Sequence, residues 1–256
     1  MPRRRRRLGV AVGVVLLTAT PLAACGSDDS GGDGQGADEP AATSSTTEGT
    51  TSTSAPDAPS EDVAFTSADG VELAGRIYGD GATAIVASHE SSGSKANFAS
   101  SAPRLAAAGF TVLAYDNRGD GGSNAGDPAQ RIQDLIAAVE LVRTRGATKV
   151  FLLGASRGGT LSLTGATQIP VDGLITISAP PPAEDPASVA AVTVPSLYVN
   201  SENDGYADST QAMYDAANEP KRLQMYPGSG HGVALFARHA DLIDLVVNFI
   251  REHGGA

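Results

Sequence analysis

From Glu61 onward, the chain alternates short runs of β-branched residues with segments whose apolar residues recur at helical spacing. Strands that alternate with helices along a chain are typical of a parallel sheet, with helices covering both of its faces. This pattern predicts an α/β domain over residues 61–256. We expect a mostly parallel sheet of eight strands with helices on both faces.

The first two predicted strands differ from the others because they form a hairpin. Val63–Ser67 and Val71–Tyr78 flank the tripeptide Ala68-Asp69-Gly70. An Asp-Gly pair between two extended runs is typical of a tight turn. We therefore expect an antiparallel pair at the edge of the sheet.

The remaining predicted strands and helices alternate along the chain. Because the connection between Ser178 and Ser196 is short and rich in proline, we expect no large cap domain. The later predicted strands are Thr83–Ser88, Phe110–Tyr115, Lys149–Leu153, Gly173–Ser178, Ser196–Asn200 and Arg222–Tyr226. The predicted helices are Phe98–Ala108, a helix that begins at Asp127-Pro128 and ends before Gly146, Gly158–Thr167, Asp208–Asn218 and His239–His253.

Ser156 is the candidate nucleophile. It lies in Gly154-Ala155-Ser156-Arg157-Gly158, directly after an apolar predicted strand and at the start of a predicted helix. In a strained turn from strand to helix, a side chain two residues before or after the serine would collide with neighbouring backbone, and glycine avoids that collision. The start of the helix also offers N–H groups that can stabilise negative charge on a substrate oxygen. The alternative is a glycine-rich turn whose serine has no catalytic role.

A serine hydroxyl becomes a good nucleophile only when a base accepts its proton, and in proteins that base is usually a histidine held by a carboxylate. The chain has four histidines. His231 lies in a glycine-rich loop between the last predicted strand and the last predicted helix, so we predict that it is the base. His239 and His253 fall on or beside that helix, where a solvent-facing position is expected, and His89 precedes the serine. The alternative for His231 is a turn residue without a catalytic role.

Asp204 is the candidate carboxylate. It lies in Ser201-Glu202-Asn203-Asp204-Gly205, directly after the predicted strand Ser196–Asn200. That strand is expected to end at the same edge of the sheet as the strand before Ser156. Glu202 and Asp208 are the alternatives, and an Asp-Gly turn without a catalytic role is a further one.

Together, these residues make the segment Glu61–Gly254 resemble a compact α/β-hydrolase domain, close to the dienelactone-hydrolase-like and small serine-esterase branches. The chain order serine, aspartate, histidine is the order found in that superfamily. Ser88–Gly93 occupies the position of the oxyanion loop, and its His-Glu pair resembles the dienelactone-hydrolase version. The resemblance implies that the backbone N–H groups of Ser91 and Arg157 form the oxyanion hole. Tyr115–Ser123 is similar to a segment that serves as a structural loop in many relatives.

The resemblance implies a serine hydrolase that acts on carboxylic esters through an acyl-enzyme and needs no metal or cofactor. Dienelactone hydrolases proper use a cysteine nucleophile, so Ser156 favours general ester chemistry. The expected partner is a small ester or acyl compound. Acyl transfer or peptide hydrolysis by the same three residues is an alternative. A binding lipoprotein that has the hydrolase fold but no turnover is another.

Residues 1–24 are predicted to be a lipoprotein signal peptide. Five consecutive arginines precede the mostly apolar stretch Leu8–Leu22, which is shorter than the roughly 20 residues of a membrane-spanning helix. The ending Leu22-Ala23-Ala24-Cys25 resembles a bacterial lipobox, in which the cysteine is lipidated and becomes the mature N-terminus. Because Cys25 is the only cysteine, lipidation leaves no thiol for a disulfide or a nucleophile. An ordinary secretory signal is the alternative, and the arginines are compatible with either the twin-arginine or the general secretory route.

Residues 25–60 are predicted to be a disordered tether that follows the lipidated Cys25, because this segment consists mainly of small and polar residues. The predicted location is the extracytoplasmic face of the cell membrane. Loss of the five signal arginines would change the net charge from −11 to −16. A strongly negative protein repels phosphate backbones and anionic lipid headgroups, so no nucleic-acid partner is expected. Attachment to the membrane would then depend on the acyl chains.

Overall fold

The computed structural model describes residues 59–254. The predicted signal peptide (1–24), Cys25 and all but the last two residues of the predicted tether lie outside the described residues. The first strand begins at Ser60, one residue before the predicted start of the folded domain. In the described part of the chain, no helix combines the length and the apolar character needed to cross a membrane.

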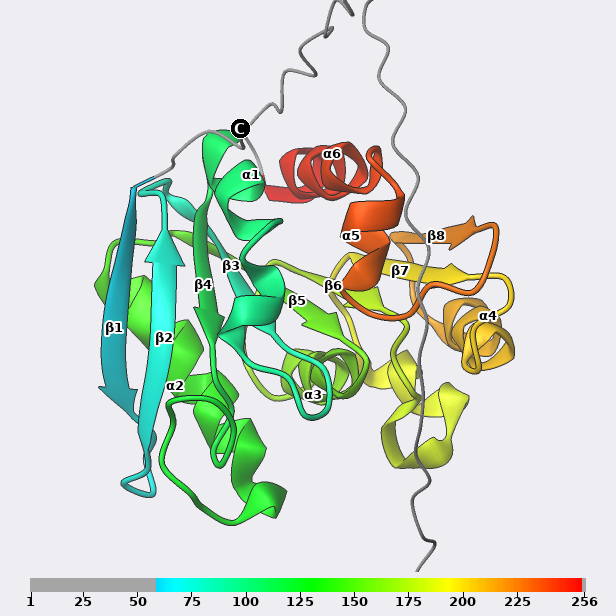
Figure 1. The fold of residues 1–256 in the computed structure, drawn as a ribbon. Helices are drawn as coiled ribbons and strands as arrows, with labels where there is room; N and C mark the ends of the chain where they lie inside the picture. Colours follow the sequence, from blue (N-terminus) through cyan, green and yellow to red (C-terminus); the bar gives the residue numbers. More distant parts are fainter. Residues whose placement is uncertain (1–58, 255–256) are drawn as a thin grey trace, which may run out of the picture. The chain divides into compact units, whose positions relative to one another are not determined.

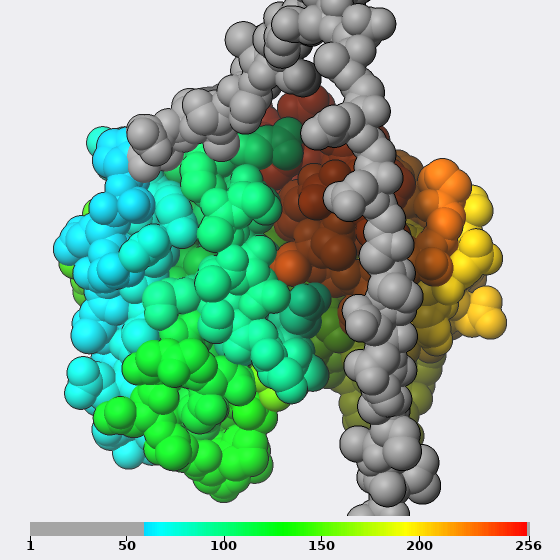
Figure 2. Space-filling model, viewed as in Figure 1, coloured from blue at the N-terminus to red at the C-terminus, as the bar shows by residue number. Residues whose placement is uncertain are grey.

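Eight strands within residues 59–254 form one sheet, in the spatial order β1-β2-β4-β3-β5-β6-β7-β8 (Figure 1). β1 and β2 form an antiparallel hairpin, whose side chains are blue at the left edge of Figure 2, and β2 also pairs antiparallel with β4. All other neighbouring strands are parallel. The predicted eight-stranded, mostly parallel sheet with a hairpin at its edge is therefore confirmed. The strands are β1 (Ser60–Thr66), β2 (Glu72–Tyr78), β3 (Thr83–Ser88), β4 (Thr111–Tyr115), β5 (Lys149–Ala155), β6 (Gly173–Ile177), β7 (Ser196–Ser201) and β8 (Lys221–Tyr226).

The helices connect these strands, and short 3-10 helices, written η, occur in the loops. The prediction of one continuous helix over Phe98–Ala108 is wrong. A helix through this segment would need an N–H from Pro103 to bond to the carbonyl of Ala99, and proline has no N–H and a ring that clashes with that carbonyl. The helices are η1 (Lys95–Phe98), α1 (Ala102–Ala107), η2 (Pro128–Gln130), α2 (Arg131–Thr144), α3 (Arg157–Ala166), η3 (Pro182–Glu184), η4 (Pro186–Ala191), α4 (Ala207–Ala216), α5 (Ala234–Arg238) and α6 (Leu242–Gly254).

Two further helices differ from the prediction at their starts. The helix predicted from Asp127-Pro128 begins as the 3-10 helix η2, and α2 follows at once. The helix predicted over His239–His253 begins only at Leu242, because His239 has the extended dihedral angles φ −126° and ψ 100°. The short helix α5 lies before this break and was not predicted.

Helices cover both faces of the sheet, as predicted (Figure 1). α1, α5 and α6 pack on one face, where Phe151 and Leu153 of β5 point. α2, α3 and α4 pack on the other face, where Val150 and Leu152 point. Because successive side chains of a strand point to opposite faces, β5 contributes to both apolar cores. This central position makes β5 a rigid support for the residue that follows it.

The loop after β4 connects the hairpin to α2 through a buried arginine. The Arg118 guanidinium donates to Asp134 of α2 at 2.7 Å and to Asp69 of the hairpin turn at 2.9 Å. The side chains of Arg118 and Asp134 are fully buried. These contacts agree with the structural role that the resemblance implied for Tyr115–Ser123.

The carboxyl ends of three parallel strands bear the three predicted catalytic residues. Ser156 follows β5, Asp204 lies three residues beyond β7, and His231 lies in the loop after β8. β5, β6, β7 and β8 are consecutive neighbours, and parallel strands end at the same edge of a sheet. The connection between β6 and β7 contains the 3-10 helices η3 and η4.

Candidate active site

Ser156 occupies the turn between β5 and α3 with a backbone conformation that is rare for a residue with a side chain. Its dihedral angles are φ 49° and ψ −121°. A Cβ atom added at Gly154 would collide with the carbonyl oxygen of Gly158, and one added at Gly158 would collide with the carbonyl oxygen of Ser88. The two glycines therefore lie where the backbone approaches too closely for any side chain, as the sequence pattern indicated.

Backbone hydrogen bonds on both sides hold Ser156 in this conformation. Its N–H donates to the carbonyl of Ile177 in β6 at 2.8 Å, and its own carbonyl accepts from the N–H groups of Gly159 and Thr160 in α3 at 2.8 and 3.1 Å. A strained backbone conformation of this kind costs about 1 to 3 kcal/mol and persists only where the surrounding structure enforces it. The residue as a whole is only 9% exposed, so Ser156 is almost buried in this turn.

Asp204 and His231 form a hydrogen-bonded pair. The distance from Nδ1 of His231 to Oδ2 of Asp204 is 2.7 Å. The Asp204 side chain is 5% exposed and the His231 side chain 40% exposed. An ionised carboxylate accepts from Nδ1–H, which leaves Nε2 of the imidazole as a proton acceptor.

Of the three candidate carboxylates, Asp204 is the one that contacts His231. Its other oxygen, Oδ1, accepts from the N–H of Tyr206 at 2.9 Å and from the side-chain amide of Asn200 at 3.3 Å. In the described structure, Glu202 and Asp208 are exposed and form no hydrogen bond or ion pair with His231. The alternatives considered from the sequence therefore do not have the geometry that orients an imidazole.

The loop that bears His231 packs against the loop after β3 and against Gly154–Gly158, which contain the candidate nucleophile Ser156 and are named the nucleophile turn. A Cβ added at Gly232 would lie 3.9 Å from the Cβ of Ala155, the residue before Ser156. The same Cβ would collide with a carboxylate oxygen of Glu90, which also accepts from the N–H of Val233 at 3.4 Å. Glycine at this position therefore lets the His231 loop approach Glu90 closely. The contact with Glu90 was not predicted from the sequence, in which the glycine directly after His231 is the only indication of a close approach.

Among residues 59–254, no hydrogen bond joins the Ser156 hydroxyl to the His231 imidazole. The structure thus brings Asp204 and His231 together and places the His231 loop beside the nucleophile turn. In enzymes without bound substrate, catalytic hydrogen bonds are often long and shorten when substrate binds.

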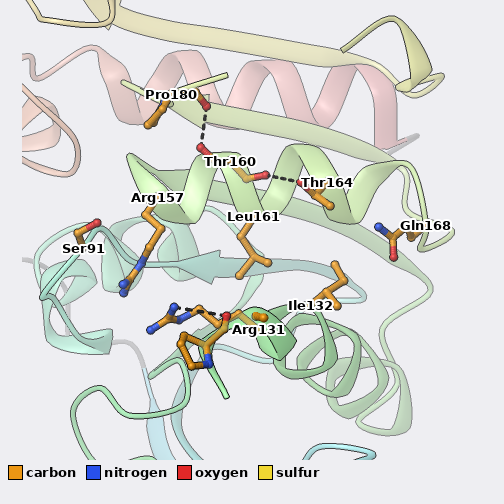
Figure 3. Close-up of a pocket in the computed structure, with 11 residues that line it drawn as sticks. Ser91, Arg131, Ile132, Arg157, Thr160, Leu161, Thr164, Gln168 and Pro180 are labelled. Carbon is orange, nitrogen blue, oxygen red and sulfur yellow. Dashed lines mark hydrogen bonds between the residues drawn. The ribbon is translucent and has the colours of Figure 1, made fainter. Parts of the chain in front are cut away.

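The two residues predicted to form the oxyanion hole border the same pocket. Arg157 is the first residue of α3, where a backbone N–H has no acceptor within the helix. Ser91 lies in the turn after β3, which a hydrogen bond from the N–H of Gly93 to the carbonyl of Glu90 closes at 3.2 Å. Figure 3 shows Ser91 and Arg157 at the same end of the pocket, which has a volume of about 660 Å³. Their role as oxyanion donors stays a prediction.

His89 has a structural environment and not that of a catalytic base. It is completely buried, Nδ1 lies 2.7 Å from the carbonyl of Glu90, and Nε2 accepts from the N–H of Asn117 at 3.1 Å. Burial is the main influence on this imidazole and lowers its pKa, which favours the neutral ring. His89 therefore connects the loop after β3 to the loop after β4.

In the part of the chain that the structure describes, no three His, Cys, Asp or Glu side chains form a group that could hold a metal ion. The chemistry available at this edge of the sheet is that of a serine hydroxyl, an imidazole held by a carboxylate, and backbone N–H groups.

Residues 82–186 match the Hydrolase_4 family model, which is described as serine aminopeptidase, S33. This range contains Ser156 and ends before Asp204 and His231. No curated protein matches the sequence.

The fold resembles those of solved hydrolases. The esterase Pf2001 of Pyrococcus furiosus is 16% identical, with a TM-score of 0.69 over 77% of this chain and 94% of the esterase. The α/β hydrolase GrgF of Penicillium sp. sh18 is 18% identical, with a TM-score of 0.68 over 76% of this chain and 99% of GrgF. The esterase EaEST of Exiguobacterium antarcticum is 16% identical, with a TM-score of 0.62 over 75% of this chain and 100% of EaEST. The domain therefore has the α/β-hydrolase fold.

Proposed function

We propose that this protein is a serine hydrolase that cleaves carboxylic esters, with Ser156 as nucleophile, His231 as general base and Asp204 as the residue that orients the imidazole. The observation that carries this proposal is the 2.7 Å contact between His231 and Asp204. The strained conformation of Ser156, the fold and the match to a hydrolase family support it.

The proposed reaction has two halves. In the first, the Ser156 hydroxyl attacks the ester carbonyl carbon while Nε2 of His231 accepts its proton. The backbone N–H groups of Ser91 and Arg157 stabilise the resulting oxyanion. The bond from carbon to the alcohol oxygen then breaks, and His231 returns the proton to the departing alcohol.

In the second half, water attacks the acyl-enzyme in the same way. Nε2 of His231 accepts a proton from the water, the carboxylic acid leaves, and the proton returns to Ser156. Asp204 remains ionised throughout and stabilises the imidazolium that forms in each half.

A fluorophosphonate probe tests the nucleophile directly. We expect the purified protein to be labelled and its Ser156→Ala variant to be unlabelled while keeping the wild-type circular dichroism spectrum. A panel of esters with graded acyl length, followed by product analysis, then establishes hydrolysis as opposed to transfer to another acceptor. A correctly folded wild-type protein that stays unlabelled would replace this proposal with that of a binding protein.

Hydrolysis of amides is the second candidate, because the matching family model is described as a serine aminopeptidase. The same three residues can cleave an amide bond. Aminoacyl para-nitroanilides and the corresponding aminoacyl esters separate the two activities. Faster turnover of the anilides would favour the peptidase.

We further propose that the protein is anchored to the extracytoplasmic face of the cell membrane by lipid on Cys25. The support for this is the sequence of residues 1–25 alone. The small ester substrate would then be met outside the cytoplasm.

A further inference from the structure

The pocket beside Arg157 is a groove between the start of α2 and one side of α3. The side of α3 presents Arg157, Thr160, Leu161 and Thr164 to the groove. These residues occupy positions i, i+3, i+4 and i+7, so they share one helix face and span about 10 Å along the axis. The opposite wall includes Arg131 and Ile132, and Ser91 also borders the groove.

Both arginines of this groove lie at the end that contains Ser91. Figure 3 shows their guanidinium groups directed toward each other, while Leu161, Ile132 and Gln168 lie farther along the groove. Arg131 is the first residue of α2 and Arg157 the first residue of α3. The N-terminus of a helix has a partial positive charge, so both helix starts add to the positive charge of the side chains.

The acidic groups nearby do not neutralise the two arginines fully. Asp120 accepts from Nη2 of Arg157 at 2.7 Å, and the same carboxylate oxygen lies 3.9 Å from Nη2 of Arg131. Asp134, the other acid close to Arg131, is engaged by the buried Arg118 at 2.7 Å. One carboxylate therefore lies between two guanidinium groups, which leaves one net positive charge.

Hydrogen bonding at the two arginines is also incomplete. The Nε atoms of Arg131 and Arg157 are buried and have no hydrogen-bond partner among the described residues. A buried donor without an acceptor costs roughly 1 to 3 kcal/mol. Burial and then the charge of Arg157 lower the pKa of Arg131, as expected where two cations share one anion. An additional anion between the two arginines would balance the remaining positive charge and accept hydrogen bonds, so its binding there would be favourable.

The position of the groove indicates which part of a substrate it would receive. In the proposed reaction, His231 protonates the departing alcohol, so the alcohol lies on the His231 side of Ser156. The lining of the groove includes the two predicted oxyanion donors and no residue of the loop 228–232. The acyl part of the substrate, on the other side of the carbonyl, is therefore the part that extends into the groove.

We propose that this groove binds an acyl chain that ends in a second carboxylate, so that the preferred substrates are monoesters of short dicarboxylic acids. This inference rests on the proposed esterase function and adds a substrate class to it. Arg131 and Arg157 bind the carboxylate, because the planar guanidinium group matches a carboxylate with two parallel hydrogen bonds. Because the two arginines lie at the end of the groove that contains Ser91, only a short acyl chain can separate this carboxylate from the ester carbonyl.

The net charge of the protein helps to identify the origin of any preference for anionic substrates. At a net charge of −11, the protein as a whole repels anions. A preference for an anionic substrate therefore has to come from a local group of cations and not from the general field.

The experiment compares pairs of esters that differ only in charge. The monoethyl esters of succinic, glutaric and adipic acid are each paired with the ester whose free carboxylate is replaced by a neutral amide, and kcat/KM is measured for both. We expect the carboxylate ester to be preferred, and Arg131→Gln to lower that preference about tenfold, as for the loss of a hydrogen bond to a charged group. Asp120→Asn should raise the preference, because it removes the carboxylate that competes for the two arginines.

Arg143→Gln is the matched control, because it removes the same charge from the same helix, about 18 Å along its axis. The Arg143 side chain contacts the carbonyl of Pro170 and lies outside the groove. We expect Arg143→Gln to leave the preference unchanged. Equal effects of Arg131→Gln and Arg143→Gln would overturn the inference, as would the absence of any preference for the carboxylate esters.

A binding measurement separates this inference from the proposed function. Calorimetric titration of the Ser156→Ala protein with monoethyl glutarate should show binding that the additional change Arg131→Gln weakens about tenfold. If the fluorophosphonate labels the wild-type protein but the esters show no charge preference, the carboxylate site is wrong and the hydrolase stands. If the probe does not label the protein while calorimetry shows the predicted binding, the hydrolase is wrong and the anion site stands.

Discussion

Asp204 is held by three hydrogen bonds, of which the one to His231 is the shortest at 2.7 Å. The other two come from the backbone of Tyr206 and the side chain of Asn200, and they direct Oδ2 toward the imidazole. A carboxylate fixed in this way selects the ring orientation and stabilises the imidazolium that forms during the reaction. This is the residue-scale feature on which the proposed activity depends most.

We expect Asp204→Asn to lower kcat/KM for ester hydrolysis by about four orders of magnitude, because the amide stabilises neither the required tautomer nor the imidazolium. The matched control is Glu202→Gln, which removes an exposed carboxylate two residues away and should keep activity within about twofold of wild type. Urea denaturation monitors whether either variant is folded. If both variants retained similar activity, Asp204 would have no part in the reaction.

Asp69 makes the stability of the folded protein depend on pH. Its hydrogen bond with the Arg118 guanidinium, and then that with the Ser67 hydroxyl, hold the pKa of this carboxyl well below its usual range. A carboxylate whose pKa is lowered by folding stabilises the folded state above its unfolded pKa of about 3.9. That contribution is lost as the pH falls through the lower pKa of the folded state.

We therefore expect Asp69→Asn to be less stable than wild type near neutral pH, with the difference shrinking progressively below about pH 5. Urea denaturation at a series of pH values measures the free energy of unfolding of both proteins. A difference that stays constant from neutral pH to about pH 2 would show that the ion pair with Arg118 is not formed.

At the scale of single elements, the turn from β5 to α3 leaves no room for side chains on either side of Ser156. A Cβ at Gly158 would collide with the carbonyl oxygens of both Ser88 and His89. Those atoms belong to the end of β3 and the loop that follows it, so the collision would push the predicted oxyanion loop away from the nucleophile turn. The conformation of the turn at Ser156 therefore depends on the position of the end of β3.

We expect Gly158→Ala to lower the free energy of unfolding by about 3 kcal/mol or more, at the upper end of the range for overpacked positions. Fluorophosphonate labelling should fall in parallel. Gly205→Ala is the control, because a Cβ there would have no atom within 4 Å and Gly205 does not need a positive φ. Urea denaturation compares the two variants, and equal stability would contradict the close approach of β3 to the turn.

At the scale of the whole molecule, the folded domain accounts for the proposed chemistry, and the first residues of the chain account for the proposed location. The described domain contains the sheet, both apolar cores and all three predicted catalytic residues. Cys25 lies outside the described residues and upstream of β1. Location and activity should therefore be separable by one substitution.

We expect Cys25→Ser to move the protein from the membrane fraction to the soluble fraction or the medium, because the acyl chains would be its only attachment. Labelling by a fluorophosphonate should stay within about twofold of wild type, since the domain is unchanged. Ser27→Ala is a nearby control that should remain in the membrane fraction. Mass spectrometry of the wild-type N-terminal peptide checks for the diacylglyceryl group, and an unmodified Cys25 would contradict the anchor.

The sequence by itself determined the elements and the nucleophile turn. Strand and helix positions follow from local apolar periodicity, and the turn at Ser156 follows from sterics within five consecutive residues. Such features depend on near neighbours in the chain, so they can be read directly from it. The local signals failed where two effects competed, as at Pro103, where apolar spacing favours a helix and the missing N–H interrupts it.

Three contacts were decided only by the tertiary structure. It shows that Asp204, and not Glu202 or Asp208, contacts His231. It also brings Glu90 against Gly232 and places Asp120 beside Arg131 and Arg157. In each case the partners are brought together by strand order and by loop conformation, and a rotation of one residue in a loop redirects its side chain. Local periodicity contains no information about that direction. The elements that bear the proposed catalytic residues could therefore be predicted from the chain, whereas the contacts that orient those residues depend on packing between segments far apart in sequence.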